Sequence, residues 1–392
     1  MRQIILDTET TGLYPEQGHR IIELAGLGPA PFCAMMLADM GATVIRVDRV
    51  SAQPGEAALV DPQLRNRRSI ALNLKNAAGI AALLRLIDGA DALIEGFRPG
   101  VAERLGVGPD VCLARNPKLV YGRMTGWGQS GPFAHSAGHD INYLALTGAL
   151  HLIGEPGRKP VPPLNLVADY GGGGMMLLAG LLAALLEASR SGKGQVIDAA
   201  MTDGVIALLS IYFGMRAADP GFRDETGQLF LAGAAPYYGT FETSDGKYLA
   251  IGSIEPQFYA LLLDKLGVDG KFLAAGYPGS RRHWPAAEAA IAAAVRTKTR
   301  DEWAAIFEGT DACVAPVLSL GEAAKHPHNV ARGSFITVNG VEQHAPAPRF
   351  SRTVAAPVQA PHRAGADSCE ILAEAGFSAA EIEQLRAADG LS

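Results

Sequence analysis

Apolar and polar positions follow a repeating order along the first third of the chain. Short runs rich in β-branched residues, typical of buried strands, alternate with stretches whose apolar residues have helical spacing. Strands are expected at residues 19–24, 42–49, 91–97 and 118–124, and helices at residues 30–41 and 76–90. Because strands that alternate with helices usually pair in parallel, this order predicts an α/β domain with a doubly wound parallel sheet and helices on both faces.

The pattern changes near residue 225, where a second and smaller α+β domain is expected. The segment "PYYGTFETSDGKYLAIGS" predicts a β-hairpin with "SDG" as its turn. Helical stretches then follow at residues 255–267, 284–297 and 300–309. We therefore assign residues 21–224 to a large domain and residues 225–330 to the small one.

The remaining segment, residues 331–392, is expected to return to the large domain. Its proline-rich part, residues 345–365, predicts an extended connection. Two short helices should follow. Ser378 and Glu381, three residues apart, have the spacing of a capping box at the start of the second helix.

Composition narrows the class of protein. Hydrophobic residues make up 48% of the 392 residues and charged residues 19%, as in an ordinary soluble globular protein. The formal net charge of −6 argues against a nucleic-acid partner, since such proteins usually carry a basic field. Cys33, Cys112, Cys313 and Cys369 lack C-x-x-C spacing, which predicts neither zinc nor disulfides and fits a reducing, cytoplasmic location. The most apolar run, residues 171–188, is too short for a membrane span, so we expect a buried helix.

The N-terminus carries a separate signal. In "MRQIILDTETTG", Asp7 and Glu9 alternate along a short apolar strand and project to the same face. Such a pair begins the Mg²⁺ site of two-metal nucleases, and residues 1–20 resemble the start of a DEDD proofreading exonuclease. The other carboxylates that such an enzyme needs do not follow. We therefore expect solvated residues of a foreign extension, and a Mg²⁺-dependent 3'-5' exonuclease is a disfavoured alternative.

A dinucleotide site is also disfavoured. It would require G-x-G-x-x-G after the first strand. The segment "GLGPAP" has Gly26 and Gly28, but Pro31 stands where the third glycine belongs. We expect these two glycines to let the backbone turn tightly toward another ligand.

Two segments place titratable side chains among small residues. His139 and Asp140 lie in "AGHDINY", which predicts a loop, and Asp169 lies just before four glycines that open an apolar helix. A carboxylate there would lie at the positive end of the helix dipole, and glycine N–H groups would admit a ligand closely. The residues alone also allow a plain N-cap for Asp169 and a hydrogen-bonded loop histidine for His139.

Over about residues 21–392 the chain resembles the α-methylacyl-CoA racemases of the CaiB/BaiF (class III) CoA-transferase superfamily. The segments that carry the resemblance are "RNRRSIALNLK", "LIEGFRPGVAERLG", "GRMTGWGQSGP", "AGHDINYLALTG", "PPLNLVADYGGGG", "SGKGQVIDAAM", "GAAPYYGTFE", "IEPQFY", "DACVAPVLSL" and "PAPRFSRT". The resemblance implies a Rossmann-like large domain, the CoA-transferase family III fold and an interlocked homodimer. It implies an acyl-CoA substrate and no metal or separate cofactor, because CoA is part of the substrate.

The resemblance also implies a mechanism, in which a 2-methylacyl-CoA thioester is racemised by 1,1-proton transfer through an enolate. His139 and Asp169 would be two bases on opposite faces of the α-carbon, and Glu255 would orient or tune His139. Backbone N–H groups near Asp140 are candidate donors to the enolate oxygen. Taken alone, Glu255 is as well explained as the acid before a helix that starts at Pro256.

A larger set of residues is expected to contact CoA. By resemblance, Arg49 is a phosphate contact, Arg98 and Arg104 are further CoA contacts, and "ALNLK" is similar to the edge that receives the adenine. The full set is Arg49, Leu72, Asn73, Leu74, Lys75, Gly96, Phe97, Arg98, Arg104, Gly138, Asp140, Ile141, Asn142 and Tyr143. The basic segment also offers Arg65, Arg67 and Arg68, for which a solvated basic face is the alternative.

The main alternative function is that of a CoA-transferase from the same superfamily. Asp169 would then be a nucleophile that forms anhydride and thioester intermediates. Transferases of the family carry a run of glycines in a small-domain loop, and the corresponding segment here, "FLAGAAPYYGTFE", has none. They also lack the histidine of "GHDINY". Both features favour the racemase.

Overall fold

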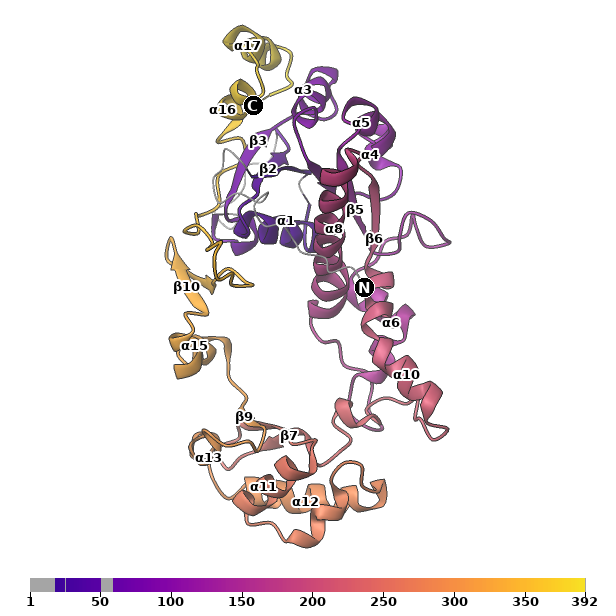
Figure 1. The fold of residues 1–392 in the computed structure, drawn as a ribbon, viewed down its shortest axis with the longest axis vertical. Coiled ribbons are helices and arrows are strands. Elements are labelled where there is room, and N and C mark those ends of the chain that lie inside the picture. The colour runs from indigo at the N-terminus through magenta and orange to yellow at the C-terminus, as the bar shows by residue number, and fades with distance from the viewer. Residues whose placement is uncertain (1–17, 25, 51–58, 392) are drawn as a thin grey trace. The chain divides into compact units, whose positions relative to one another are not determined.

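The computed structural model describes residues 18–24, 26–50 and 59–391. The chain divides into two compact units (Figure 1). Unit 1 contains the described residues up to Thr147, then Leu164–Ser210 and the described residues from Gly333 onward. Unit 2 contains Gly148–Pro163 and Ile211–Arg332. Asp7 and Glu9 lie outside the described residues.

Unit 1 is built on one six-stranded sheet whose strand order is β3-β2-β1-β4-β5-β6. Every neighbouring pair of strands in it is parallel, as the sequence pattern predicted. The strands are β1 (Arg20–Leu24), β2 (Thr43–Asp48), β3 (Arg67–Ala71), β4 (Ala92–Glu95), β5 (Val120–Thr125) and β6 (Val196–Ala200). Strand β3 falls in the basic segment that the sequence analysis took for a phosphate contact.

Helices cover both faces of this sheet. They are α1 (Pro29–Asp39), α3 (Ala77–Ile87), α4 (Val101–Arg104), α5 (Pro109–Arg115), α6 (Asp140–Thr147), α8 (Met175–Ser191) and α9 (Met201–Leu208). A short 3-10 turn, η2 (Pro62–Leu64), precedes β3, and a π-helical segment, η3 (Leu166–Gly174), leads directly into α8. Helices α1 and α8 pack against each other and the sheet on one face. On the other face, Leu83 of α3 and Cys112 of α5 join one buried core with strand residues such as Ile45.

The C-terminal segment completes unit 1. It contains the antiparallel pair β10 (Phe335–Val338) and β11 (Val341–His344), then α16 (Ser368–Glu374) and α17 (Ala379–Ala387), which lie beside α3 and β3 (Figure 1). Ile371 and Leu385 enter the same core as α3. Helix α17 begins with the predicted capping box of Ser378 and Glu381.

Unit 2 combines a three-stranded antiparallel sheet, in the order β7-β8-β9, with short helices. The strands are β7 (Tyr238–Glu242), β8 (Tyr248–Gly252) and β9 (Val314–Pro316), and the first two form the predicted hairpin. The helices are α7 (Ala149–Leu152), α10 (Ser210–Ala218), η4 (Phe230–Ala232), α11 (Pro256–Leu266), η5 (Gly270–Ala275), η6 (Arg281–His283), α12 (Trp284–Val295), α13 (Arg300–Phe307), α14 (Leu320–Ala323) and α15 (Pro327–Ala331). The predicted small domain, residues 225–330, lies within unit 2, which also takes in Gly148–Pro163.

One helix in the described part of the chain is long and apolar enough to cross a membrane by length and composition. It is the continuous helix Leu166–Ser191, with a mean hydropathy of 1.6 over its most apolar window. Half of that window is buried inside the protein, where η3 and α8 pack against α1 and α9. Burial of this kind is what the core helix of a globular domain requires, so the helix gives only weak support for a membrane span.

Candidate active site

The predicted CoA contacts gather at one edge of the large sheet. Arg49 directly follows β2, Lys75 follows β3, and Gly96, Phe97 and Arg98 follow β4. The loop with His139 comes after β5. All of these positions lie at the carboxyl ends of parallel strands, which is where ligands bind in open α/β sheets.

A cavity of about 250 Å³ opens between the loops after β4 and β5. Residues named from the sequence line it: Gly96, Phe97, Arg98, Gly138, His139 and Tyr143. The sequence analysis missed a second group, from the end of β5 and the loop behind it: Met124, Thr125, Gly126, Trp127, Ala134, Ser136 and Ala137. The quoted segment "GRMTGWGQSGP" contains the first four of these, so it was the available signal.

Tyr143 holds the loop that carries His139. Its hydroxyl donates a hydrogen bond to the Gly138 carbonyl at 2.5 Å, and its ring packs edge-on against Trp127 with centroids 4.8 Å apart. A Cβ at Gly138 would lie 2.7 Å from the Tyr143 ring, and one at Gly126 would overlap it. Glycine is therefore required at both positions by the packing of this ring.

His139 immediately precedes α6. Its backbone N–H donates to Asn142 Oδ1 at 3.1 Å, while its carbonyl accepts from the Asn142 N–H at 2.8 Å. This reciprocal pair fixes the helix start and leaves the His139 side chain exposed at the cavity. Ile141 and Asn142 are exposed as well.

Asp140 connects this loop to the segment that carries Asp169. Its side chain is buried, and Oδ1 accepts hydrogen bonds from the backbone N–H groups of Ala168 and Asp169, each at 2.8 Å. Asp140 thus joins the two predicted bases, since it is bonded to His139 in the chain and hydrogen-bonded to the Asp169 backbone, although 30 residues of sequence separate the bases.

Asp169 is half-buried within η3, and its carboxylate has two close neighbours. Asn165 donates to Oδ2 at 3.2 Å. Gly28, with a positive φ of 73°, lies so close that a Cβ there would be 3.7 Å from Oδ2. The tight turn predicted at Gly28 therefore approaches the Asp169 side chain.

The surroundings raise the pKa of the Asp169 carboxyl above its ordinary value. Burial is the largest cause, and the negative charge of Asp140 acts in the same direction. The Asn165 hydrogen bond and the nearby His139 oppose the shift. A carboxylate with a raised pKa is a stronger base, which suits removal of a weakly acidic proton.

The glycine run after Asp169 has a different role from the predicted one. Gly172, Gly173 and Gly174 are buried. A Cβ at Gly172 would lie 2.8 Å from the Val205 backbone nitrogen in α9, and one at Gly174 would lie 2.9 Å from the Pro29 carbonyl in α1. These glycines allow close helix packing, so the expectation that they admit a ligand is wrong for them.

The prediction that the basic segment before and within β3 contacts CoA also needs correction. Arg65 and Arg67 are buried, and their guanidinium groups pair with Asp39 and Glu23 respectively. Arg68 pairs with Glu374 at 2.8 Å. Two of the three arginines are thus enclosed in ion pairs within unit 1 and are not available to a phosphate.

The predicted adenine edge is only partly exposed. The Leu72 side chain belongs to the buried core, and Leu74 packs against it. Asn73 Nδ2 donates to the Asp389 carbonyl at 3.1 Å. Any contact of Leu72 with a ligand must therefore come from its backbone, whereas Lys75 is exposed.

Arg49, Arg98 and Arg104 are exposed as well. No ion pair within residues 18–24, 26–50 and 59–391 involves these three arginines or Lys75. Their charges are therefore not neutralised by a carboxylate of the described chain.

Glu255 belongs to unit 2. It is exposed and directly precedes α11, which begins at Pro256, as the helix-start interpretation expected. Its charge contributes to the raised pKa of Cys313, for which burial is the larger cause.

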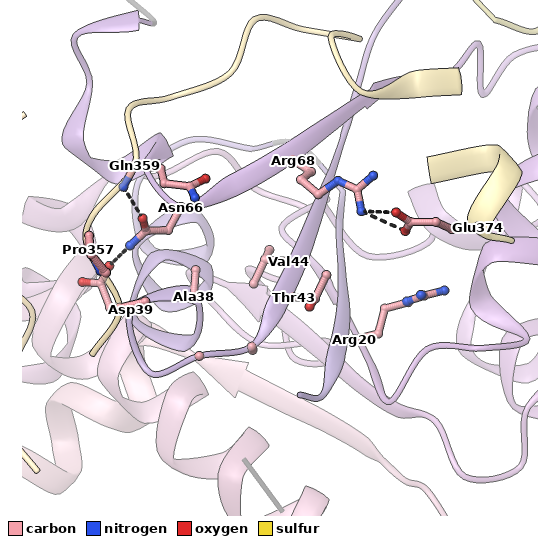
Figure 2. A pocket seen from close by; sticks show the side chains of 13 residues that line it. Arg20, Ala38, Asp39, Thr43, Val44, Asn66, Arg68, Pro357, Gln359 and Glu374 are labelled. Atoms are coloured by element: carbon pink, nitrogen blue, oxygen red, sulfur yellow. Dashed lines mark hydrogen bonds and ion pairs between the residues drawn. The ribbon is translucent and has the colours of Figure 1, made fainter. Parts of the chain in front are cut away.

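A larger cavity, of about 510 Å³, lies at the opposite, amino edge of the sheet (Figure 2). Arg20, Thr43 and Val44 line it at the starts of β1 and β2. Figure 2 shows polar contacts in its lining, among them Arg68 with Glu374 and Asn66 with Asp39, and draws none for Arg20. Of the residues that the sequence analysis offered for ligand binding, Arg68 lines this cavity. Within the described part of the chain, no group of three or more His, Cys, Asp or Glu side chains could hold a metal ion.

Known proteins resemble this chain in sequence and in fold. The model of CoA-transferase family III matches residues 17–368, and the chain belongs to that family. The α-methylacyl-CoA racemase of Mus musculus is 48% identical over 371 residues, which cover 94% of this chain and 95% of the relative. The α-methylacyl-CoA racemase of Homo sapiens is 46% identical with the same coverage. The crystal structure of a CaiB/BaiF family protein from Brucella suis matches with a TM-score of 0.78 and 26% identity, covering 91% of this chain and 98% of that one.

Proposed function

We propose that this protein is an enzyme that racemises 2-methylacyl-CoA thioesters at the α-carbon. The observation that carries the proposal is the hydrogen-bonded connection from the His139 loop through Asp140 to Asp169, at the carboxyl edge of the sheet. The names of the two racemase relatives, each similar over nearly its whole length, support it further.

The chemistry requires two bases and a stabilised enolate. One base removes the α-proton, the electrons move onto the thioester oxygen, and the conjugate acid of the other base returns a proton to the opposite face. A neutral imidazole at His139 and an ionised carboxylate at Asp169 would exchange these roles according to the hand of the substrate. The raised pKa of Asp169 supports its assignment as a base.

The enolate oxygen needs hydrogen-bond donors that are already in place. Asp140 is the first residue of α6, and the first N–H groups of a helix have no partner within the helix. The Asp140 N–H is therefore our candidate donor, and a donor of this kind is worth about 3 kcal/mol in comparable sites.

CoA would bind along the basic lip that Arg49, Lys75, Arg98 and Arg104 form at the carboxyl edge. Their exposure and their lack of carboxylate partners support this assignment. The thioester would lie in the cavity beside His139, lined by Phe97 and Tyr143. No metal or further cofactor takes part in the proposed reaction, and a cytoplasmic location accords with the free cysteines.

A homodimer is part of the proposal, with Glu255 of the small domain orienting or tuning His139. Exposed apolar side chains support it, because they gather on elements of unit 1 that pack together: α6, η3, α8 and α9. These exposed side chains include Ile141, Leu146, Leu166, Met175, Ile206 and Leu208. An apolar surface of this kind marks a protein interface. A fully active monomer in sedimentation would contradict the dimer.

The deciding experiment incubates the protein with one enantiomer of a 2-methylacyl-CoA in D₂O. We expect epimerisation together with uptake of deuterium at the α-carbon. A CoA-transferase would instead move CoA to an added carboxylic acid and leave the α-hydrogen unexchanged. That result would assign the protein as a CoA-transferase instead, with Asp169 as its nucleophile.

A further inference from the structure

We infer that the side chain of Asp140 is a positioning residue, which holds the Asp169 base in place through the backbone N–H groups of Ala168 and Asp169. The inference rests on the proposed function and adds to it, since the proposed mechanism uses only the backbone N–H of Asp140.

The two hydrogen bonds act on the backbone of the segment that carries the base. Both N–H groups belong to the first turn of η3, where backbone donors lack partners within the helix. A single oxygen, Asp140 Oδ1, accepts both at 2.8 Å. It therefore fixes the backbone from which the Asp169 side chain projects.

The segment that carries Asp169 has few other restraints near its start. Leu164 and Leu166, on either side of Asn165, are exposed, and the hydrogen bond from Asn165 to Asp169 is 3.2 Å long. The glycines behind Asp169 pack closely but have no side chains to lock a rotamer. The Asp140 carboxylate thus ties this turn to α6 through two hydrogen bonds.

The unused oxygen of Asp140 argues against a purely structural cap. Oδ2 is buried and has no hydrogen-bond partner among the described residues, and Asp140 is only 7% exposed. A buried carboxylate oxygen without a partner costs free energy that a serine cap, with its single side-chain oxygen, would avoid. The charge nevertheless acts on the site, since it helps raise the pKa of Asp169.

The test compares Asp140→Ala, Asp140→Glu and Asp140→Asn in D₂O, with exchange measured separately for each enantiomer of a 2-methylacyl-CoA. Asp140→Ala keeps the backbone N–H but removes the acceptor. A base displaced by about 1 Å loses about a hundredfold in rate, so we expect exchange to fall by about 10- to 100-fold for the enantiomer served by Asp169. Exchange of the other enantiomer should fall much less, and KM should change little because the CoA contacts remain.

The conservative variants separate hydrogen bonding from charge. Asp140→Asn retains an oxygen that accepts both N–H groups, so it should recover most of the exchange that Asp140→Ala loses. Asp140→Glu keeps the charge but moves the acceptor by one methylene, so exchange should again fall selectively for the enantiomer served by Asp169. This variant tests the inference if Asp140→Ala fails to fold. Asp203→Ala, which removes an exposed carboxylate from α9 beside η3, is the matched control and should behave as the wild type.

Equal losses for both enantiomers in Asp140→Ala and Asp140→Glu would overturn the inference, and so would wild-type exchange in both variants. An Asp140→Asn variant as impaired as Asp140→Ala would also overturn it, since charge rather than the two hydrogen bonds would then matter. These outcomes differ from failure of the proposed function, in which the wild-type protein itself exchanges neither enantiomer.

Discussion

The two edges of the large sheet offer two cavities, and the larger one is not the candidate site. At the amino edge, about 510 Å³ is lined by Arg68, which pairs with Glu374, and by Arg20, whose side chain makes no ion pair with the described residues. At the carboxyl edge, about 250 Å³ is lined by His139 and by Arg98, whose charge no described carboxylate pairs. The comparison teaches that volume alone does not identify a site. The direction of the strands identifies it, because ligands of open α/β sheets bind at the carboxyl ends of the strands.

The largest effect is expected from the two bases at the carboxyl edge. His139→Ala should reduce α-deuterium exchange of one enantiomer, expected to be S, by about 10²- to 10⁴-fold, the usual worth of a positioned base. Exchange of the other enantiomer should survive with retention, because its own base is intact. Asp169→Ala should show the mirror pattern. Racemisation must fall in both directions for each variant, and equal loss of exchange from both enantiomers would refute one base per face.

A large effect of another kind is expected near the amino edge. Arg65→Ala leaves Asp39 buried without its partner, so the free energy of unfolding should fall by about 3–5 kcal/mol. Arg68→Ala removes a partly exposed pair and should cost only about 0–1 kcal/mol. Denaturant titration measures both. The KM for acyl-CoA should stay at the wild-type value in both folded variants. A raised KM would indicate instead that these arginines bind CoA.

A moderate effect is expected from the basic lip. Arg49→Ala should raise KM by about 10- to 100-fold, because a hydrogen bond to a charged group is worth about 1.5–3 kcal/mol. The kcat should stay near normal, since a phosphate contact acts alike in the ground and transition states. Arg20→Ala, at the larger cavity of the amino edge, is the matched control and should leave both constants unchanged. Loss confined to kcat in Arg49→Ala would contradict the assignment.

The smallest effect is expected at the N-terminus. The double variant Asp7→Ala with Glu9→Ala should racemise at the wild-type rate, because two carboxylates cannot assemble a two-metal site. Degradation of single-stranded DNA that requires Mg²⁺ and disappears in this variant would restore the exonuclease alternative.

The sheet was predictable where a strand contains a run of apolar residues and was missed where adjacent charges shorten that run. Strands β1, β2, β4 and β5 follow from β-branched runs, and the residues after them mark the carboxyl edge. Strand β3 was missed because Arg67 and Arg68 interrupt its pattern. Their partners Glu23 and Glu374 lie 44 and 306 residues away, and nothing local in the sequence indicates such pairs.

The site was predictable in its residue types but not in its connections. His139 and Asp169 were named from the resemblance, whereas the bond from Asp140 to the Asp169 backbone spans 29 residues and needs the fold. The sequence of a glycine run does not distinguish contact with a ligand from contact with another helix. Only the distances to Val205 and Pro29 showed that helices do.

The attachment of the C-terminal segment to β3 has a consequence for biosynthesis. Helices α16 and α17 fill one face of the large core, and Leu391 pairs with Leu72 at the end of β3. On the ribosome these residues emerge only after all of unit 2 has been translated, so the core of unit 1 stays incomplete while unit 2 can already bury its own core. Closing a loop of this length is slow. We therefore expect the nascent large domain to be the part of this chain that depends on chaperones, with its β3 edge as the surface they protect.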